Sequence, residues 1–284
     1  MTVVVPTNLI DALEALRLMP DAHIVAGGTD LMVEVNFNRR KPTDVIALRR
    51  VSELGTWAVS ADGNFVTIGA GVPYCKMESG EIAILLPALA QAARTVGSPQ
   101  IRAAGTLGGN LGTCSPAGDG LPVLFALDAV VHLRSASNNR DVSIHDFMVG
   151  VKRNVRNVDE IITGVTMPVR SGWQGYSKVG VRNAMVISTA SACLSIDKTN
   201  GSAQLALGSV GPTIIRCRKA EAWVALHHDL VSSTPIAPEV AKEFGEIAAS
   251  EARPIDDHRS TAQYRRHAIS TMSRRLMLRA FPNE

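Results

Sequence analysis

Four glycines fall within the fourteen residues TLGGNLGTCSPAGD at positions 106–119. Glycine has no Cβ, so a segment this rich in glycine can turn tightly and approach another group closely. Phosphate is a common ligand of such segments, but the P-loop pattern ends in Gly-Lys-Ser/Thr and the dinucleotide pattern requires GxGxxG. The segment contains neither pattern. It therefore predicts a close approach of the backbone to a ligand without help from a lysine.

A second glycine pair, Gly27-Gly28, has the same setting. It follows an apolar run at 22–26 that predicts a buried strand, and it precedes a predicted helix over 31–40. Free backbone N–H groups at such a join bind anions, and residues 108–110 offer a similar nest. Two nests can hold a diphosphate between them, although each glycine pair can also be a simple turn. Side-chain hydrogen bonds are expected from Thr29, Asn110 and Ser115.

Hydrophobic patterning divides the chain into three units, residues 1–55, 56–170 and 171–284. The first is a small α/β unit with its first helix capped by Thr7 and a second strand at 44–48. In the second unit the pattern predicts two strands within 56–71, helices over 81–96 and 119–127, and strands over 128–134 and 160–168. In the third unit it predicts a strand meander with a turn at Asn200-Gly201, then helices over 219–227, 237–251 and 259–281.

Composition excludes several classes of protein. The 284 residues are 46% hydrophobic and 19% charged, which is typical of a globular chain. The net charge is only +3, and no basic run with interleaved aromatics points to nucleic acid. No signal-peptide pattern or membrane-spanning apolar run is seen, which favours a cytoplasmic protein. The four cysteines are far apart and show no CxxC or Cys/His spacing, so we expect no metal site or iron–sulfur cluster on this chain, and in a reducing compartment we expect no structural disulfide.

An ordered set of motifs makes the chain recognisable. AGGTDL, TLGGNL and SPAGD resemble the FAD-binding medium subunits of molybdenum hydroxylases, a family that includes carbon monoxide dehydrogenase, quinoline oxidoreductase and the flavin portion of xanthine dehydrogenase. The resemblance continues to the C-terminal region and covers nearly the whole chain. The further matching segments are LDAVVHL (127–133), DEIITGVTMP (159–168), YSKVGVR (176–182) and DDHRSTAQYRR (256–266).

The resemblance implies an α+β fold. Residues 1–55 and 56–170 would be two small α/β subdomains that together form a PCMH-type FAD-binding fold. Residues 171–284 would be the C-terminal medium-subunit domain, with a small antiparallel sheet and helices. No catalytic residue and no metal ligand is expected on this chain.

The resemblance also implies which residues bind FAD. Residues 26–31 and 107–110 would surround the diphosphate with backbone N–H groups, and Lys178 would lie beside the flavin, where a cation stabilises the anionic reduced ring. The full predicted set is Ala26, Gly27, Gly28, Thr29, Asp30, Leu31, Thr106, Leu107, Gly108, Gly109, Asn110, Ser115, Asp119, Asp128, Ile162 and Lys178.

Alternatives remain for three members of the set that are not in the glycine segments. Asp119 and Asp128 match positions near the adenosine or ribitol part of FAD, but Asp119 can instead cap the helix that follows it. Asp128 can instead end that helix in a turn. Lys178, at the rim of a strand, can simply be solvated.

The implied function is electron transfer. In the resembled enzymes a large subunit carries the molybdenum cofactor and a small subunit carries two [2Fe–2S] clusters. The medium subunit passes electrons through FAD to an external acceptor, and the usual assembly is a dimer of heterotrimers. Two alternatives stay open: a self-contained flavoprotein oxidoreductase of the same fold, and a non-redox module that binds a nucleotide.

Overall fold

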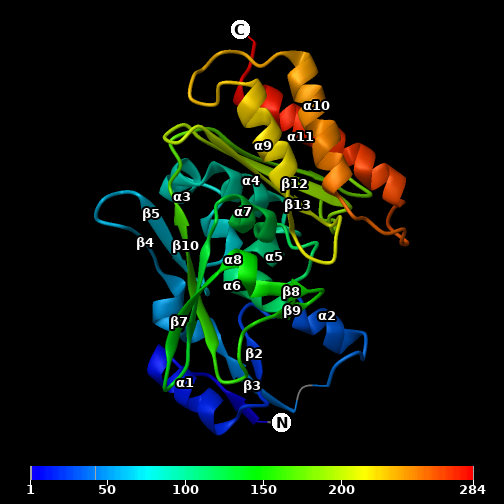
Figure 1. Ribbon diagram of the computed structural model, residues 1–284. Coiled ribbons are helices and arrows are strands. Elements are labelled where there is room, and N and C mark those ends of the chain that lie inside the picture. The colour runs from blue at the N-terminus through cyan, green and yellow to red at the C-terminus, as the bar shows by residue number, and fades with distance from the viewer. Residues whose placement is uncertain (1, 42, 284) are drawn as a thin grey trace.

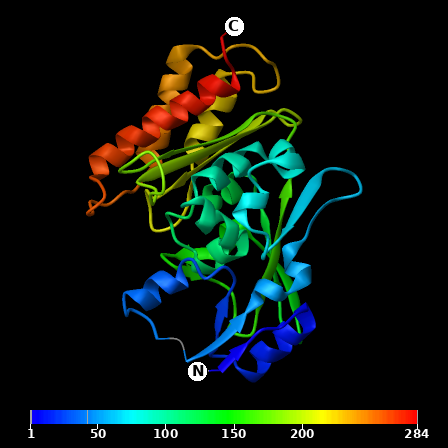
Figure 2. The ribbon, with the colours of Figure 1, turned by 180° about the vertical axis from the view of Figure 1, so that it is seen from behind.

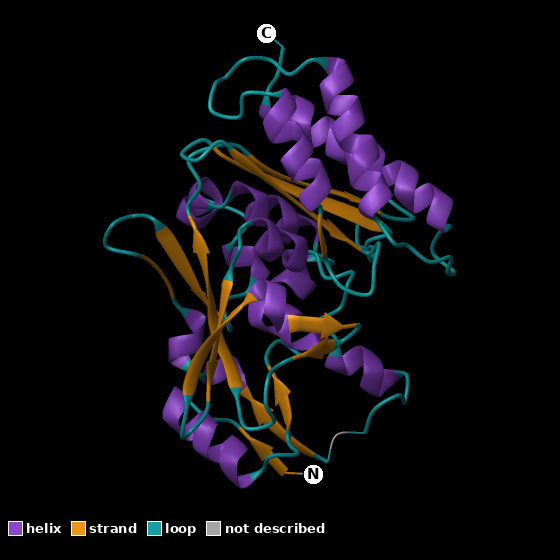
Figure 3. Cartoon of the chain, in the orientation of Figure 1, coloured by secondary structure: helices purple, strands orange, loops and turns teal. Residues whose placement is uncertain are grey.

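The computed structural model describes residues 2–41 and 43–283 (Figure 1). Within these residues the strands form sheets of three, five and four strands and one two-stranded ribbon. Helices lie between the five-stranded and four-stranded sheets and cover the outer face of the latter (Figures 1 and 3). The predicted mixture of helices and several small sheets is confirmed.

The first sheet is parallel, with the strand order β1–β3–β2. Its segment contains β1 (Thr2–Val4), α1 (Leu9–Leu18), β2 (His23–Val25), α2 (Leu31–Asn36) and β3 (Asp44–Ala47). The predicted cap of α1 was wrong by one residue: the Asn8 side chain, and not that of Thr7, accepts the backbone N–H of Asp11 at 2.9 Å. Helix α2 is four residues shorter than predicted, and the Asp30 side chain makes no capping bond.

The second sheet is antiparallel, with the order β4–β5–β10–β6–β7. Its strands are β4 (Trp57–Val59), β5 (Phe65–Gly69), β6 (Val130–Arg134), β7 (Asn139–Ser143) and β10 (Ile161–Pro168). The short helices of this unit are α3 (Gly80–Leu85), α4 (Pro87–Thr95), α5 (Pro99–Ala104), α6 (Leu107–Thr113), α7 (Gly120–Ala126) and α8 (Ile144–Phe147). Three further turns of 3-10 helix are η1 (Leu48–Arg50), η2 (Ser52–Gly55) and η3 (Tyr74–Lys76), and β8 (Met148–Gly150) pairs with β9 (Arg153–Asn154).

The single helix predicted over 81–96 is two helices in the structure. Helix α3 ends before Leu86, and Pro87 begins α4. Proline lacks an N–H and its ring obstructs the preceding turn, so it starts a helix well but interrupts one. Gly97 follows α4 with a φ of +47°, a conformation that commonly ends a helix.

The third sheet is an antiparallel meander, β11–β12–β13–β14, as the alternating pattern predicts. Its unit contains β11 (Gln174–Val179), β12 (Ala190–Asp197), β13 (Ser202–Gly208), β14 (Ile215–Arg216), α9 (Arg218–His227), α10 (Pro238–Glu251) and α11 (Ala262–Ala280). Helices α9 and α11 pack on one face of the sheet, and α4 and α7 contact it from the second unit (Figures 1 and 2). No helix in the described part of the chain is long and apolar enough to cross a bilayer.

Asp128 joins the second and third units. Its carboxylate accepts hydrogen bonds from Arg216 in β14 at 2.5 Å and from Arg170 at 3.1 Å, and His145 Nε2 lies 2.8 Å away. Burial alone would raise the pKa of Asp128. The His145 hydrogen bond and the Arg216 charge outweigh that effect and lower it to about 2. The cluster therefore favours the ionised carboxylate in the folded chain.

Asp128→Asn should lower the free energy of unfolding by about 1–2 kcal/mol at neutral pH, a figure reduced for the partial exposure of the carboxylate. Asparagine tolerates the φ of +50° at this position, so the change removes mainly the charge. Because the folded pKa lies below the ordinary value of 3.8, this stability is present above about pH 4 and is lost as the pH falls toward 2. Urea unfolding at several pH values should show that the difference in unfolding free energy between the Asp128→Asn variant and the unaltered chain shrinks as the pH falls toward 2. A difference that grows in acid would contradict the assignment.

Candidate cofactor-binding cleft

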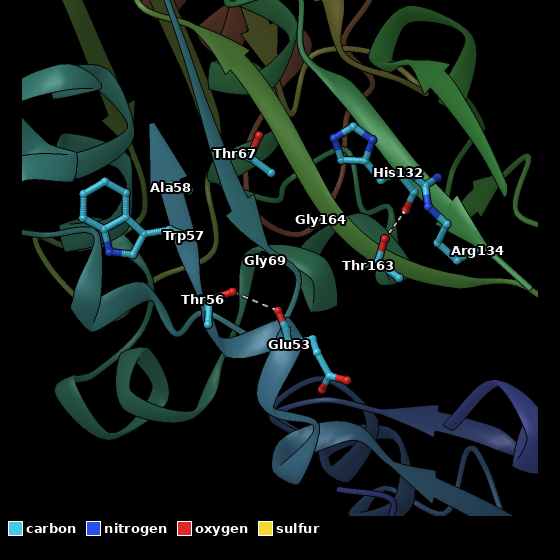
Figure 4. A pocket seen from close by; sticks show the side chains of 10 residues that line it. All are labelled: Glu53, Thr56, Trp57, Ala58, Thr67, Gly69, His132, Arg134, Thr163 and Gly164. Carbon is cyan, nitrogen blue, oxygen red and sulfur yellow. Dashed lines mark hydrogen bonds between the residues drawn. The ribbon is translucent and has the colours of Figure 1, made fainter. Parts of the chain in front are cut away.

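The structure contains a small hollow and a much larger cleft. The small one, about 310 Å³, lies on the five-stranded sheet between β4, β5, β10 and β6 (Figure 4). Its polar groups are bonded within the chain: the Thr163 hydroxyl donates to the His132 carbonyl, and the His132 ring bonds Asp141 and Thr166. The larger one, about 1030 Å³, brings together both glycine segments. Organic ligands occupy clefts of roughly 300–1,000 Å³, so the larger cleft has room for a dinucleotide.

The turn between β2 and α2 forms one wall of the large cleft. Gly28 has a φ of +71°, which side chains other than glycine rarely adopt. Among the described residues, no acceptor pairs with the backbone N–H groups of residues 27–31. Such a run of unpaired N–H groups is an anion-binding nest made of main chain. The first predicted glycine segment therefore leaves its backbone N–H groups free to bind an anion.

The second glycine segment differs from the prediction, because residues 107–113 form helix α6 and not a loop. The Thr106 hydroxyl caps this helix by accepting the Gly109 N–H at 2.9 Å. The Gly108 N–H donates to the Ala70 carbonyl, and that of Asn110 donates to the Thr106 carbonyl. The N–H groups of residues 108–110 are therefore already paired within the chain. The predicted second nest is absent from this part of the described chain.

Helix α6 nevertheless contributes residues to the lining of the cleft. Gly109 and Asn110 line it, and a Cβ on Gly109 would lie 4.0 Å from the Ala26 Cβ on the opposite wall. Gly108 lets α6 pack closely on Ala70, because a Cβ on Gly108 would lie 2.4 Å from the Ala70 Cβ. Leu107 is fully buried in the core and does not line the cleft.

Asp119 lines the cleft, is only 8% exposed and lies next to Lys178 of the third unit. Its carboxylate accepts a hydrogen bond from Lys178 at 2.6 Å and one from the Tyr176 hydroxyl at 3.0 Å, and its side chain makes no capping bond to α7. Burial raises the pKa of Asp119, and the Lys178 charge opposes that effect. Lys178 is only 6% exposed, so it is neither solvated nor part of the cleft lining. It acts on the cleft through Asp119.

The structure thus brings most of the predicted set to one place. The members that line the cleft are Ala26, Gly27, Gly28, Thr29, Asp30, Leu31, Thr106, Gly108, Gly109, Asn110, Ser115, Asp119 and Ile162. Leu107, Asp128 and Lys178 do not line it, and Asp128 belongs to the cluster between the second and third units. Cys114 is buried, which raises its pKa to about 12, so it has no reactive thiolate beside the cleft.

Several cleft residues carry no signal in the sequence. Lys152, in the turn between β8 and β9, reaches across to Glu34 at 2.7 Å and Asp30 at 3.7 Å. Residues 185–187, from the loop after β11, add an apolar rim from the third unit, and Tyr74 adds a buried hydroxyl. The ribbon of β8 and β9 was not predicted. The contact of Lys152 with Asp30 and Glu34 joins residues that are far apart in the sequence, and no local pattern predicts such a contact.

Comparison with known proteins identifies this architecture. Residues 1–170 match the model of the FAD-binding domain in molybdopterin dehydrogenase, and residues 176–280 match the C-terminal domain of the carbon monoxide dehydrogenase flavoprotein. The chain is an FAD-binding oxidoreductase subunit. It belongs to the family of the FAD-binding medium subunits of molybdenum hydroxylases.

Individual relatives agree with this family. The nicotine 6-hydroxylase medium subunit of Paenarthrobacter nicotinovorans is 30% identical over 97% of this chain and 95% of its own. The glyceraldehyde dehydrogenase medium chain of Sulfolobus acidocaldarius is 31% identical over 94% and 93%. Carbon monoxide dehydrogenase from Hydrogenophaga pseudoflava superposes with a TM-score of 0.88 at 26% identity, covering 99% of this chain and 96% of that chain. Quinoline 2-oxidoreductase from Pseudomonas putida shares the fold, with a TM-score of 0.89 at 24% identity over 99% and 96%.

The residues present fit FAD. The unpaired N–H groups of residues 27–31 suit a diphosphate, and the volume suits a dinucleotide. Ile162, which is 8% exposed, gives an apolar contact, and Asp119 gives a carboxylate that can accept from a hydroxyl. The cleft therefore combines an apolar lining with a few polar groups, the combination found in cofactor sites.

Proposed function

We propose that this chain is the electron-transfer subunit of a multi-subunit molybdenum hydroxylase and holds FAD in the large cleft. The observation that carries the proposal is the open row of backbone N–H groups at residues 27–31, set in a cleft large enough for a dinucleotide. Bound FAD supplies one- and two-electron exchange. The chain supplies its position, its electrostatic surroundings and its shielding from water.

Each part of the cleft has a separate task in this proposal. Residues 27–31 donate N–H groups to the diphosphate, and Asn110 and Ser115 add side-chain hydrogen bonds. Asp119, held by Lys178 and Tyr176, accepts a hydrogen bond deep in the cleft. The paired charge of Lys178 reaches the cofactor through Asp119, so its effect is smaller than that of a bare cation.

The partners follow from the relatives. Those described as medium subunits or chains belong to assemblies, which supports partner subunits for this chain. We propose a large partner that carries the molybdenum cofactor and oxidises the substrate, and a small partner that carries two [2Fe–2S] clusters. Electrons from those clusters leave through this chain to an external acceptor, and the complex is a dimer of heterotrimers. The four cysteines, none of them paired in a disulfide, fit a reducing compartment such as the cytoplasm.

The proposal is tested by the visible absorption spectrum of the desalted full chain, purified with and without co-expressed partner subunits. We expect flavin bands that stay with the protein and FAD, not FMN, in the denatured supernatant. Mass spectrometry of the co-purified material should identify one large and one small subunit. A colourless protein in both preparations, with no response to added FAD, would contradict the proposal.

A further inference from the structure

Two polar atoms beside the cleft are buried without a partner. They are the Tyr74 hydroxyl oxygen in η3 and Oδ1 of the Asn110 amide in α6. Tyr74 is 3% exposed, and both residues line the cleft. A buried hydroxyl or amide oxygen without a hydrogen bond is costly, so such pairs in folded proteins call for an explanation.

The two atoms converge on the same point. A Cβ placed on Gly120 would lie 2.9 Å from the Tyr74 hydroxyl and 3.0 Å from Asn110 Oδ1. A Cβ on Gly118 would lie 2.4 Å from Asn110 Nδ2. Two glycines therefore leave the space that the Asn110 amide occupies. Oδ1 of this amide is buried without a hydrogen-bond partner, whereas Nδ2 is not.

The chemistry of the two groups is complementary. A phenol hydroxyl can donate one hydrogen bond, and an amide oxygen accepts. A donor that fixes Oδ1 leaves the two N–H groups of the amide to point the other way, toward the cleft. An unrestrained amide can turn over and present its oxygen instead, which would repel a diphosphate or flavin oxygen.

We propose that Tyr74 is a positioning residue for the cofactor: in the FAD-bound chain its hydroxyl donates to Asn110 Oδ1 and so directs the Asn110 N–H groups toward an FAD oxygen. This inference rests on the proposed function, because it requires FAD in the cleft. Tyr74 lies outside both glycine segments. Its hydroxyl orients the Asn110 side chain and does not itself contact the cofactor.

A double-mutant cycle tests the inference, with FAD affinity measured by quenching of flavin fluorescence on the full apo-chain. Tyr74→Phe should weaken FAD binding by about tenfold in the otherwise unaltered chain, the size expected for one hydrogen bond. In an Asn110→Ala background the same change should cost less than about twofold, because the amide that it orients is gone. Equal losses in both backgrounds would overturn the inference, and so would undiminished affinity in Tyr74→Phe.

The thermal stability of the apo-chain gives a second, independent readout. The Tyr74 hydroxyl has no hydrogen-bond partner within the chain, so Tyr74→Phe should leave the melting temperature of the apo-chain unchanged or raise it. A purely structural tyrosine would behave in the opposite way, with a lower melting temperature and normal FAD affinity, and that result would also overturn the inference.

The other two tyrosines of the sequence supply controls. Tyr264 is 48% exposed on α11, so Tyr264→Phe should change neither readout. The Tyr176 hydroxyl already donates to Asp119, so Tyr176→Phe should lower the melting temperature of the apo-chain. Failure of the unaltered chain to bind FAD, alone or with its partners, would be distinct from these results, because it would contradict the proposed function itself.

Discussion

Gly109→Val is expected to give a folded chain whose affinity for FAD is at least about 100-fold lower, a difference of about 2.8 kcal/mol. A Cβ on Gly109 would lie 3.2 Å from the Thr106 hydroxyl and 4.0 Å from the Ala26 Cβ, with no backbone in its way. The protein can therefore accept the side chain after a small adjustment. Because Gly109 and Ala26 both line the cleft, the two methyl groups of valine would fill the space between its walls.

Gly55→Val is the matched control for this prediction. Gly55 has no atom within 4 Å of its ideal Cβ and does not line the cleft. The variant should bind FAD normally, as judged by the flavin fluorescence titration. Circular dichroism should show both variants folded. Full FAD occupancy in the Gly109→Val chain would show that α6 does not form part of the FAD site.

Gly27→Ala is expected to lower the free energy of unfolding by about 3 kcal/mol, near the upper end of the usual cost of overpacking. The added Cβ would lie 1.8 Å from the Ala104 carbonyl oxygen and 2.5 Å from its carbon. Both obstructing atoms are backbone, so no side-chain rotation can relieve the overlap. The turn between β2 and α2 must move away from α5, and the N–H groups of residues 27–31 move with it.

Urea unfolding and FAD titration on the same preparations check this second prediction. Gly55→Ala is the control, because the same methyl group meets no atom there. We expect Gly27→Ala to be both less stable and weaker in FAD binding, since one displacement causes both effects. If Gly27→Ala proves as stable as Gly55→Ala, the close packing of this turn on α5 is refuted.

The turn at Gly27 and Gly28 could be predicted because its signal is local. An apolar strand, a glycine pair and a helix follow one another within about fifteen residues, and each has its own pattern. The strand meander and the three helices of the third unit were predicted for the same reason, since alternation and turn residues such as Asn200-Gly201 are also local. The subdivision at 55/56 remains a proposal, because the family model spans residues 1–170 as one match.

The conformation of residues 107–113 could not be predicted so easily. Three glycines in seven residues argue against a helix, because glycine costs about 1 kcal/mol per position relative to alanine. Tertiary packing reverses that preference: the absent side chain of Gly108 lets α6 lie directly on Ala70. The Thr106 hydroxyl, which caps this helix, was predicted only as a group that binds FAD.

Contacts between distant residues were beyond any local pattern. The resemblance singled out Asp119 and Lys178 separately, and only the fold shows that they form one ion pair. It also singled out Asp128, whose contacts with Arg170 and Arg216 place it in the packing of the second unit against the third. A residue in a motif shared with a family can thus serve packing and not ligand contact.

One wall of the cleft comes from residues 26–31 and its apolar rim from residues 185–187, and these residues fall in two separately matched family segments. These two parts of the cleft lining can therefore diverge independently. A hybrid that joins residues 1–170 of this chain to the C-terminal segment of a relative would keep the wall at residues 26–31, but would take the rim and the partners of Asp119 from the relative. Exchange of that segment would change the rim of the cleft while the wall at residues 26–31, where we propose the diphosphate binds, stays the same.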